Sequence, residues 1–129
     1  MSNLTEFFDS KTNISKLRQL AQDFVDERDW NKYHNPKDLA ISIAIEAAEL
    51  MEIFQWTGQG EVKKMSDDKD KLMRIKEELA DVMILCLNMG NTLGIDLSQA
   101  IVEKIEKNKA KYPAELVRGN YRKYTQLKG

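Results

Sequence analysis

The stretch IEAAELMEIFQW, from Ile45 to Trp56, has helical spacing but carries two carboxylates, Glu46 and Glu49, within its most apolar part. Residues three and four positions apart share a helix face, so each acid belongs to a line of side chains that should meet a core. Glu46 lies in line with Leu39, Ile43, Leu50 and Ile53, and Glu49 lies in line with Ile41, Ile45 and Ile53. The two acids are therefore expected to be neighbours among buried aliphatic groups.

The stretch EELADVMILCLNMG, residues 77–90, repeats the arrangement. Glu78 falls in a line with four apolar residues, Ile75, Val82, Leu85 and Met89. Asp81 lies one helical turn from Glu78. Two helices are thus each predicted to carry a pair of acids, spaced i and i+3, on an apolar face.

Four main helices account for most of the chain. They are predicted at about 14–28, 36–56, from after Ser66 to about 92, and 97–111. The predicted N-caps are Asn13 or Thr12, Asn35 before Pro36, Ser66, and Asp96 with Gln99. TGQGE should end the second helix. Because no alternating strand pattern is present, we expect an all-α four-helix bundle.

The whole chain, 1–129, is expected to form one domain, with 1–12 and 125–129 as flexible ends. The segment after Pro113 is too short for a domain and is expected to hold an extra turn or an arm.

The composition excludes several classes of function. A formal net charge of −1 makes the chain no polycation for nucleic acid. The longest apolar run is too short and too charged to span a membrane, and no secretory signal is recognisable. A single cysteine, Cys86, forms no intramolecular disulfide and suits a reducing cytoplasm. With one histidine, His34, a zinc site of Cys and His ligands is excluded within one chain, and the phosphate-binding glycine loop is missing.

The acids instead favour a divalent metal. Unpaired carboxylates that are packed together repel one another, and no lysine or arginine stands out on the same faces. Oxygen ligands with room for water suit Mg²⁺, with Mn²⁺ as a substitute. The competing interpretation is that these acids are ordinary solvated residues. The pattern also leaves open whether Glu49 pairs with Glu46 or Glu52, and whether Glu77 or Glu78 is the working acid.

Three segments carry a resemblance that covers the chain from about Leu17 to Tyr124. ERDWNKYHNPKDLAISIAIEAAELMEIFQW, EELADVMILCLNMGNTLGIDL and KIEKNKAKYP with RGNYRKY closely resemble the all-α nucleotide pyrophosphohydrolases of the MazG-like superfamily. Within it, they are most similar to the dCTP pyrophosphatase-like branch. The resemblance implies Mg²⁺-dependent hydrolysis of a nucleoside triphosphate, dCTP or a modified dCTP, to the monophosphate and pyrophosphate, with a role in nucleotide-pool housecleaning.

The resemblance also implies roles for particular residues. The metal ligands would be Glu46, Glu49, Glu78 and Asp81, with Glu46 or Glu49 as the catalytic carboxylate. The phosphate contacts would be Lys104, Asn108, Lys111 and Tyr112. Trp30 and Trp56 would hold the base. The family implies a homotetramer, a dimer of dimers, with active sites completed across subunits.

Two positions depart from the dCTP-hydrolysing pattern. Ala21 stands where that branch can place a histidine, and Leu85 where it can place a tyrosine. These residues indicate a mostly apolar base slot that selects by stacking and puts cytosine preference in doubt. The alternatives are the same chemistry on dUTP or phosphoribosyl-ATP, or a helical interaction module without turnover. His34 is interpreted as a capping or interface residue.

Overall fold

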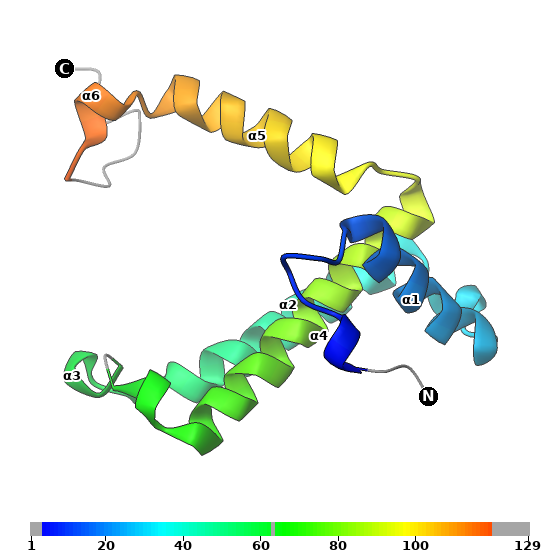
Figure 1. Ribbon diagram of the computed structural model, residues 1–129, viewed down its shortest axis with the longest axis horizontal. Coiled ribbons are helices and arrows are strands. Elements are labelled where there is room, and N and C mark those ends of the chain that lie inside the picture. The colour runs from blue at the N-terminus through cyan, green and yellow to red at the C-terminus, as the bar shows by residue number, and fades with distance from the viewer. Residues whose placement is uncertain (1–3, 63, 120–129) are drawn as a thin grey trace. The chain divides into compact units, whose positions relative to one another are not determined.

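The computed structural model describes residues 4–62 and 64–119, and the described residues form helices and turns with no strand (Figure 1). The predicted all-α class is confirmed. The chain divides into two compact units, Met1–Ile95 and Asp96–Gly129, and each is described by itself. The first unit contains η1 (Leu4–Glu6), α1 (Ile14–Glu27), η2 (Asn31–Tyr33), α2 (Pro36–Phe54), α3 (Gln59–Val62), η3 (Met65–Asp67) and α4 (Lys69–Leu93). The second contains α5 (Leu97–Lys111) and α6 (Ala114–Val117).

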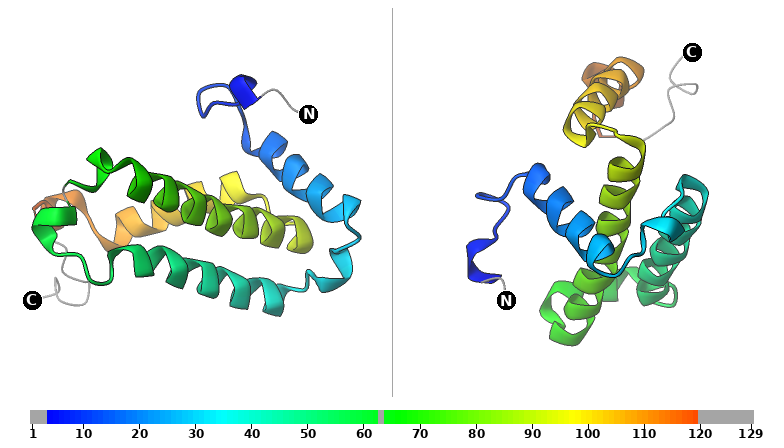
Figure 2. Two further views of the ribbon diagram at one scale, coloured as in Figure 1. Left: turned by 90° about the horizontal axis from the view of Figure 1, so that it is seen from below. Right: turned by 90° about the vertical axis from the view of Figure 1, so that its right-hand side faces the viewer.

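The first unit is built on the antiparallel pair of α2 and α4, which run side by side in Figure 2. After the link that holds α3 and η3, α4 returns along α2. Helix α1 packs against α4. The line predicted from Glu46 is the one that faces inward, since Leu39 is buried and Ile43 and Leu50 are half-buried. The buried apolar side chains of this unit are Ala21, Val25, Leu39, Ile53, Met65 and Leu87.

Local capping explains where three of the long helices begin. Asn13 accepts a hydrogen bond from the Lys16 amide at 2.8 Å and starts α1. Asn35 accepts from the Asp38 amide at 2.9 Å and starts α2, with Pro36 in the first helical position. Asp96 accepts from the Gln99 amide at 2.9 Å and starts α5. These three predicted starts are confirmed.

The predicted start of α4 was wrong. Ser66 lies inside η3, and α4 begins at Lys69 after the cap Asp68. The Asp68 carboxylate accepts from the amides of Asp70 and Lys71, both at 3.1 Å, so it satisfies two free amides of the first turn. The TGQGE segment was expected only to end α2, but its second half forms the short helix α3.

Much of the apolar surface of α2 and α4 remains exposed in the single chain. Ile45 on α2 is 53% exposed and Met83 on α4 is 56% exposed. Ile41, Met73, Leu79 and Ile84 are also exposed. Ile41, Ile45 and Glu49 of the second predicted line of α2 therefore lie at the surface of this unit, whereas Ile53, which both lines share, is buried. None of the helices among the described residues is long and apolar enough to cross a membrane.

Candidate functional site

The acids predicted from the sequence come together between α2 and α4. Glu46 and Glu49 lie one turn apart on α2, and Glu78 lies on the facing stretch of α4. One carboxylate oxygen from each of these three residues lies within 4.8 Å of the other two. We call these three residues the acidic cluster. Asp81, one turn after Glu78, is exposed yet close enough to repel the charges of both Glu46 and Glu78.

The acidic cluster lacks compensating partners. The Oε2 atoms of Glu46 and Glu78 are buried and have no hydrogen-bond partner among residues 4–62 and 64–119. The ion pairs in that part of the chain lie elsewhere, at Glu27, Asp29 and Glu106. Buried carboxylate oxygens without a partner are costly, so an arrangement of this kind indicates a ligand that supplies positive charge.

The electrostatics of the acidic cluster follow from this crowding. A hydrogen bond with Glu49, burial, and repulsion from Glu49, Asp81 and Glu78 raise the pKa of Glu46 to about 7. Burial, followed by the influence of Glu49 and Asp81, also raises the pKa of Glu78 above its ordinary value. Three close carboxylate oxygens, two of them on groups whose pKa is raised by crowding and burial, fit a hard divalent cation that would supply the missing positive charge.

A pocket of about 220 Å³ opens beside the acidic cluster, and we call it the acidic pocket. Its lining comes from α1, from the turn after α1, from α2 and from α4. The lining residues are Phe24, Trp30, His34, Glu46, Asp81, Ile84, Leu85 and Asn88. The pocket thus joins two of the predicted metal ligands to an aromatic side chain.

The end of α1 explains how Trp30 reaches this pocket. Asp29 adopts a left-handed conformation with φ 54°. The Trp30 amide donates to the Val25 carbonyl at 3.0 Å and the Asp29 amide donates to the Asp26 carbonyl at 3.1 Å. This pair of bonds is the Schellman arrangement, here with aspartate in place of the usual glycine. The Trp30 ring then meets the edge of Phe24, with ring centroids 5.8 Å apart.

The other predicted base-binding residues lie in different surroundings. Leu85 lines the acidic pocket, whereas Ala21 is buried in the core of the first unit and does not line it. Trp56, just beyond the end of α2, is 89% exposed and is not part of the pocket lining.

The predicted phosphate contacts lie in the second unit. Lys104, Asn108 and Lys111 follow one another on α5 at spacings of four and three, so they share one face of the helix. Tyr112 is the C-cap residue of α5. All four side chains are exposed in the single chain.

Three polar or aromatic members of the pocket were missed or interpreted differently from the sequence. His34 had been interpreted as a capping or interface residue, yet it lines the pocket. Phe24 and Asn88 were not singled out. The spacing Asp81, Leu85, Asn88 places all three on one face of α4, so the same periodicity that found the acids contained the signal for Asn88.

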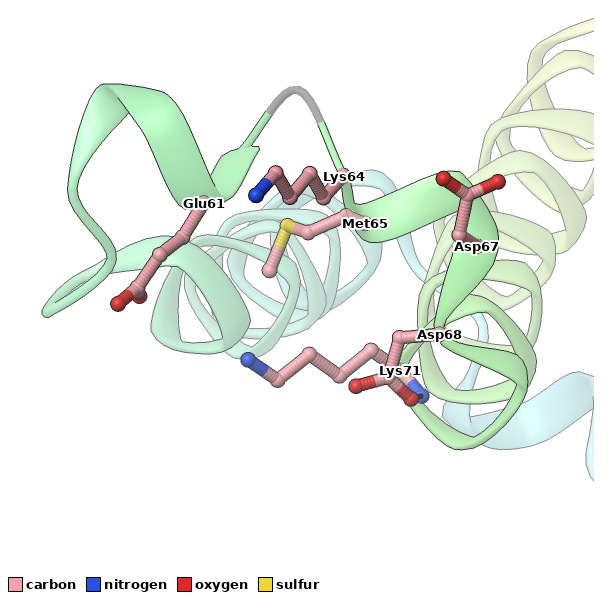
Figure 3. A pocket seen from close by; sticks show the side chains of 6 residues that line it. All are labelled: Glu61, Lys64, Met65, Asp67, Asp68 and Lys71. Atoms are coloured by element: carbon pink, nitrogen blue, oxygen red, sulfur yellow. Dashed lines mark hydrogen bonds between the residues drawn. The ribbon is translucent and has the colours of Figure 1, made fainter.

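A second pocket, of about 450 Å³, lies where η3 meets α4 and carries acids together with lysines. We call it the lysine pocket. Figure 3 shows Lys64 and Lys71 reaching to the same side, with Met65 between them. The other lining residues are Glu61, Asp67 and Asp68. One acid of this pocket therefore has a structural role, because the Asp68 carboxylate caps α4.

Comparisons with known proteins agree on one family. The sequence model of the MazG-like family matches residues 41–127. dCTP pyrophosphatase 1 of Homo sapiens is 34% identical over 120 residues, which cover 93% of this chain and 71% of the human protein. The Mus musculus protein of the same name is 33% identical with the same coverage.

A solved structure is also similar to this chain. The crystal structure of a pyrophosphatase from Archaeoglobus fulgidus DSM 4304 aligns with a TM-score of 0.69 and 42% sequence identity. The alignment covers 78% of this chain and 92% of the archaeal one. The predicted enzyme class, pyrophosphohydrolase, is confirmed, and the chain belongs to the MazG-like family.

Proposed function

We propose that this enzyme hydrolyses a nucleoside triphosphate, with dCTP or a modified dCTP as the leading substrate, to the monophosphate and pyrophosphate. The observation that carries the proposal is the pair of buried, unpartnered oxygens on Glu46 and Glu78 beside a pocket lined by Trp30. The dCTP pyrophosphatases at 33–34% identity support the choice of base. The cellular role would be housecleaning of the nucleotide pool.

Glu46, Glu49, Glu78 and Asp81 would hold Mg²⁺, for which Mn²⁺ is a substitute. When bound, the cation supplies positive charge at the phosphates of the substrate. The all-oxygen donor set and the short separations within the acidic cluster support this choice of metal.

The chain's own residues would then move one proton and steady one leaving group. A carboxylate oxygen of Glu46 or Glu49 takes a proton from water as the water oxygen bonds to the α-phosphorus. The bond from the α-phosphorus to the bridging oxygen breaks, and that oxygen leaves with pyrophosphate. Lys104, Asn108, Lys111 and Tyr112 would contact the phosphates, where negative charge develops. Trp30 and Trp56 would hold the base by its face, in a slot to which Leu85 and Ala21 contribute no polar group.

The assembly belongs to the same proposal. We propose a homotetramer, a dimer of dimers, because the exposed apolar side chains of α2 and α4 need cover. Light scattering across micromolar concentrations should give four times the mass of the chain. A monomer at every concentration would refute the assembly.

The test of the activity is a screen of nucleoside triphosphates with Mg²⁺ that measures pyrophosphate, orthophosphate and nucleotide products separately. It should include dCTP, 5-methyl-dCTP, dUTP, dTTP, dATP and phosphoribosyl-ATP. We expect equal amounts of monophosphate and pyrophosphate from a pyrimidine deoxynucleotide. Release of orthophosphate with a diphosphate product, or no turnover of any nucleotide, would contradict the proposal.

A further inference from the structure

Asn88 is a buried polar residue in the lining of the acidic pocket. Its exposed fraction is 6%. Within residues 4–62 and 64–119, it is the one polar or charged residue that is buried as a whole. The residue belongs to the lining of the acidic pocket, to which Leu85 and Trp30 also contribute. An amide in this position has lost most of its access to water and faces a cavity of about 220 Å³.

The side-chain amide of Asn88 makes no hydrogen bond with the residues that the structure describes, whereas that of Asn91 on the same helix both accepts and donates one. The Asn91 Oδ1 accepts from the Arg18 Nε at 2.9 Å, and the Asn91 Nδ2 donates to the Arg18 carbonyl at 3.0 Å. Asn91 thus has a structural role, because its hydrogen bonds join α4 to α1. Asn88 has no such structural role in the first unit.

An amide on a residue that is 6% exposed, with no partner among the described residues, is unfavourable, because its donor and its acceptor depend on a small accessible remainder for contact with water. Leucine is close in volume and would fill the same place without that cost. An asparagine without a partner in the protein is understandable at this position when a ligand supplies the missing hydrogen bonds. The pocket that faces Asn88 is the place from which such a ligand would come.

The surroundings of Asn88 define the chemistry of that ligand. Phe24, Trp30 and Leu85 make one part of the lining aromatic and apolar, while Glu46 and Asp81 carry the negative charge. A flat ring that stacks on an aromatic face and bears a donor and an acceptor on its edge fits the first part. The volume of about 220 Å³ is below the ~300–1,000 Å³ of pockets that enclose a whole drug-sized ligand, so it suits a single base.

We propose that the Asn88 amide hydrogen-bonds the edge of a pyrimidine base while Trp30 stacks on its face, which makes Asn88 a specificity-determining residue. This inference rests on the proposed function for its substrate class. The amide presents Nδ2 as a donor and Oδ1 as an acceptor, and a pyrimidine presents an acceptor and a donor side by side at N3 and the 4-substituent. Asn88 therefore supplies the edge contact that Ala21 and Leu85 do not.

The test measures binding of deoxynucleoside monophosphates, so it needs no turnover. Calorimetry would compare dCMP, dUMP, deoxyribose 5-phosphate, which has no base, and the 2-pyrimidinone deoxynucleotide, which lacks the 4-substituent. We expect wild type to bind dCMP or dUMP about 10-fold more tightly than the 2-pyrimidinone analogue, the effect of one hydrogen bond to a buried group. Asn88→Ala and the near-isosteric Asn88→Leu should both remove that difference and leave the weak binding of deoxyribose 5-phosphate unchanged.

The matched control is Asn91→Ala, which removes an amide from the same helix and should lower stability while it keeps the preference for the intact base edge. The inference is overturned if wild type shows no preference for the 4-substituted bases, or if both Asn88 variants keep it. Base-dependent binding that is lost in the Asn88 variants, in a protein that hydrolyses no triphosphate, would refute the proposed function alone. Normal hydrolysis with an unchanged base preference in the variants would refute the role of Asn88 alone.

Discussion

The acidic pocket and the lysine pocket differ in how their charges are compensated, and the smaller of them is the better candidate site. The lysine pocket measures about 450 Å³, and its lining holds three acids and two lysines. The acidic pocket measures about 220 Å³, and its described lining holds two acids and neither lysine nor arginine. Uncompensated acidic groups, rather than volume, therefore point to the place where a charged ligand binds.

The largest expected effect separates the two pockets by activity. Glu49→Gln keeps the shape of the acidic cluster but removes one negative charge that the metal and the water need. We expect kcat/KM for the preferred triphosphate to fall by at least about 1,000-fold, the scale of losing both metal binding and a general base. The free energy of unfolding should stay the same or rise, because repulsion within the cluster falls.

The matched control for that variant is Asp67→Asn in the lysine pocket. It removes the same charge from an exposed residue and should leave kcat/KM unchanged. Normal turnover in a well-folded Glu49→Gln enzyme, or an equal loss in both variants, would remove the distinction between the pockets.

A smaller effect is expected from the aromatic part of the acidic pocket. Trp30→Ala removes the ring on which a base would stack, and stacking contributes about 1–3 kcal/mol per base. We expect kcat/KM to fall by about 5- to 150-fold for all nucleotides alike. The measurement is a set of initial rates with dCTP, dUTP and dTTP at one Mg²⁺ concentration. A loss confined to one base would show that Trp30 reads an edge and not a face.

The acidic cluster also predicts how stability changes with pH. The pKa of Glu46 is about 7 in the folded chain and 4.5 ordinarily, so the folded state binds this proton more tightly than the unfolded state. The resulting stabilisation is complete below pH about 4.5, declines as the pH rises to about 7, and is absent above that. The raised pKa of Glu78 acts in the same direction.

Thermal unfolding in EDTA between pH 4.5 and 8.5 would test this dependence. The melting temperature of wild type should fall over that range by more than that of Glu46→Gln, because glutamine does not titrate. Parallel curves for the two proteins would contradict the electrostatic account of the cluster.

The smallest effect is expected from the lysine pocket. Asp68→Ala removes the cap of α4 and should lower the free energy of unfolding by about 1 kcal/mol, the usual contribution of such a residue. Since Asp68 has a structural role, kcat/KM should not change. Chemical denaturation gives the first quantity, and a change in turnover would indicate that the lysine pocket takes part in the function.

The parts of the fold and of the site that the sequence predicts are those that helical periodicity and local capping determine. Glu46 and Glu78 became candidates because they interrupt apolar lines, although the lines left Glu77 open beside Glu78 until the family resemblance chose between them. Asn35 was found because an asparagine before Pro36 is a strong start signal. Ser66 failed as a cap because Asp68, two residues later, offers a carboxylate to two amides, and spacing alone does not rank the two residues.

Other features needed the tertiary arrangement. Trp30 and His34 line the acidic pocket because the chain turns at Asp29. The left-handed conformation of Asp29 could not be predicted from helical periodicity. Asn88 shares a face with Asp81, yet its significance comes from the hydrogen bonds that it lacks, and the contrast with Asn91 is visible only once Arg18 is in place.

The central claim is that the acidic cluster holds a divalent cation that the reaction requires, and a Mg²⁺ titration of pyrophosphate release tests it most directly. Enzyme stripped with EDTA would be assayed with the preferred triphosphate from the screen as Mg²⁺ is restored, in wild type and in Glu46→Gln combined with Glu78→Gln. We predict no release without the cation, a saturable recovery in wild type, and no recovery in the double variant. Full release in EDTA, or a double variant that recovers like wild type, would contradict the claim.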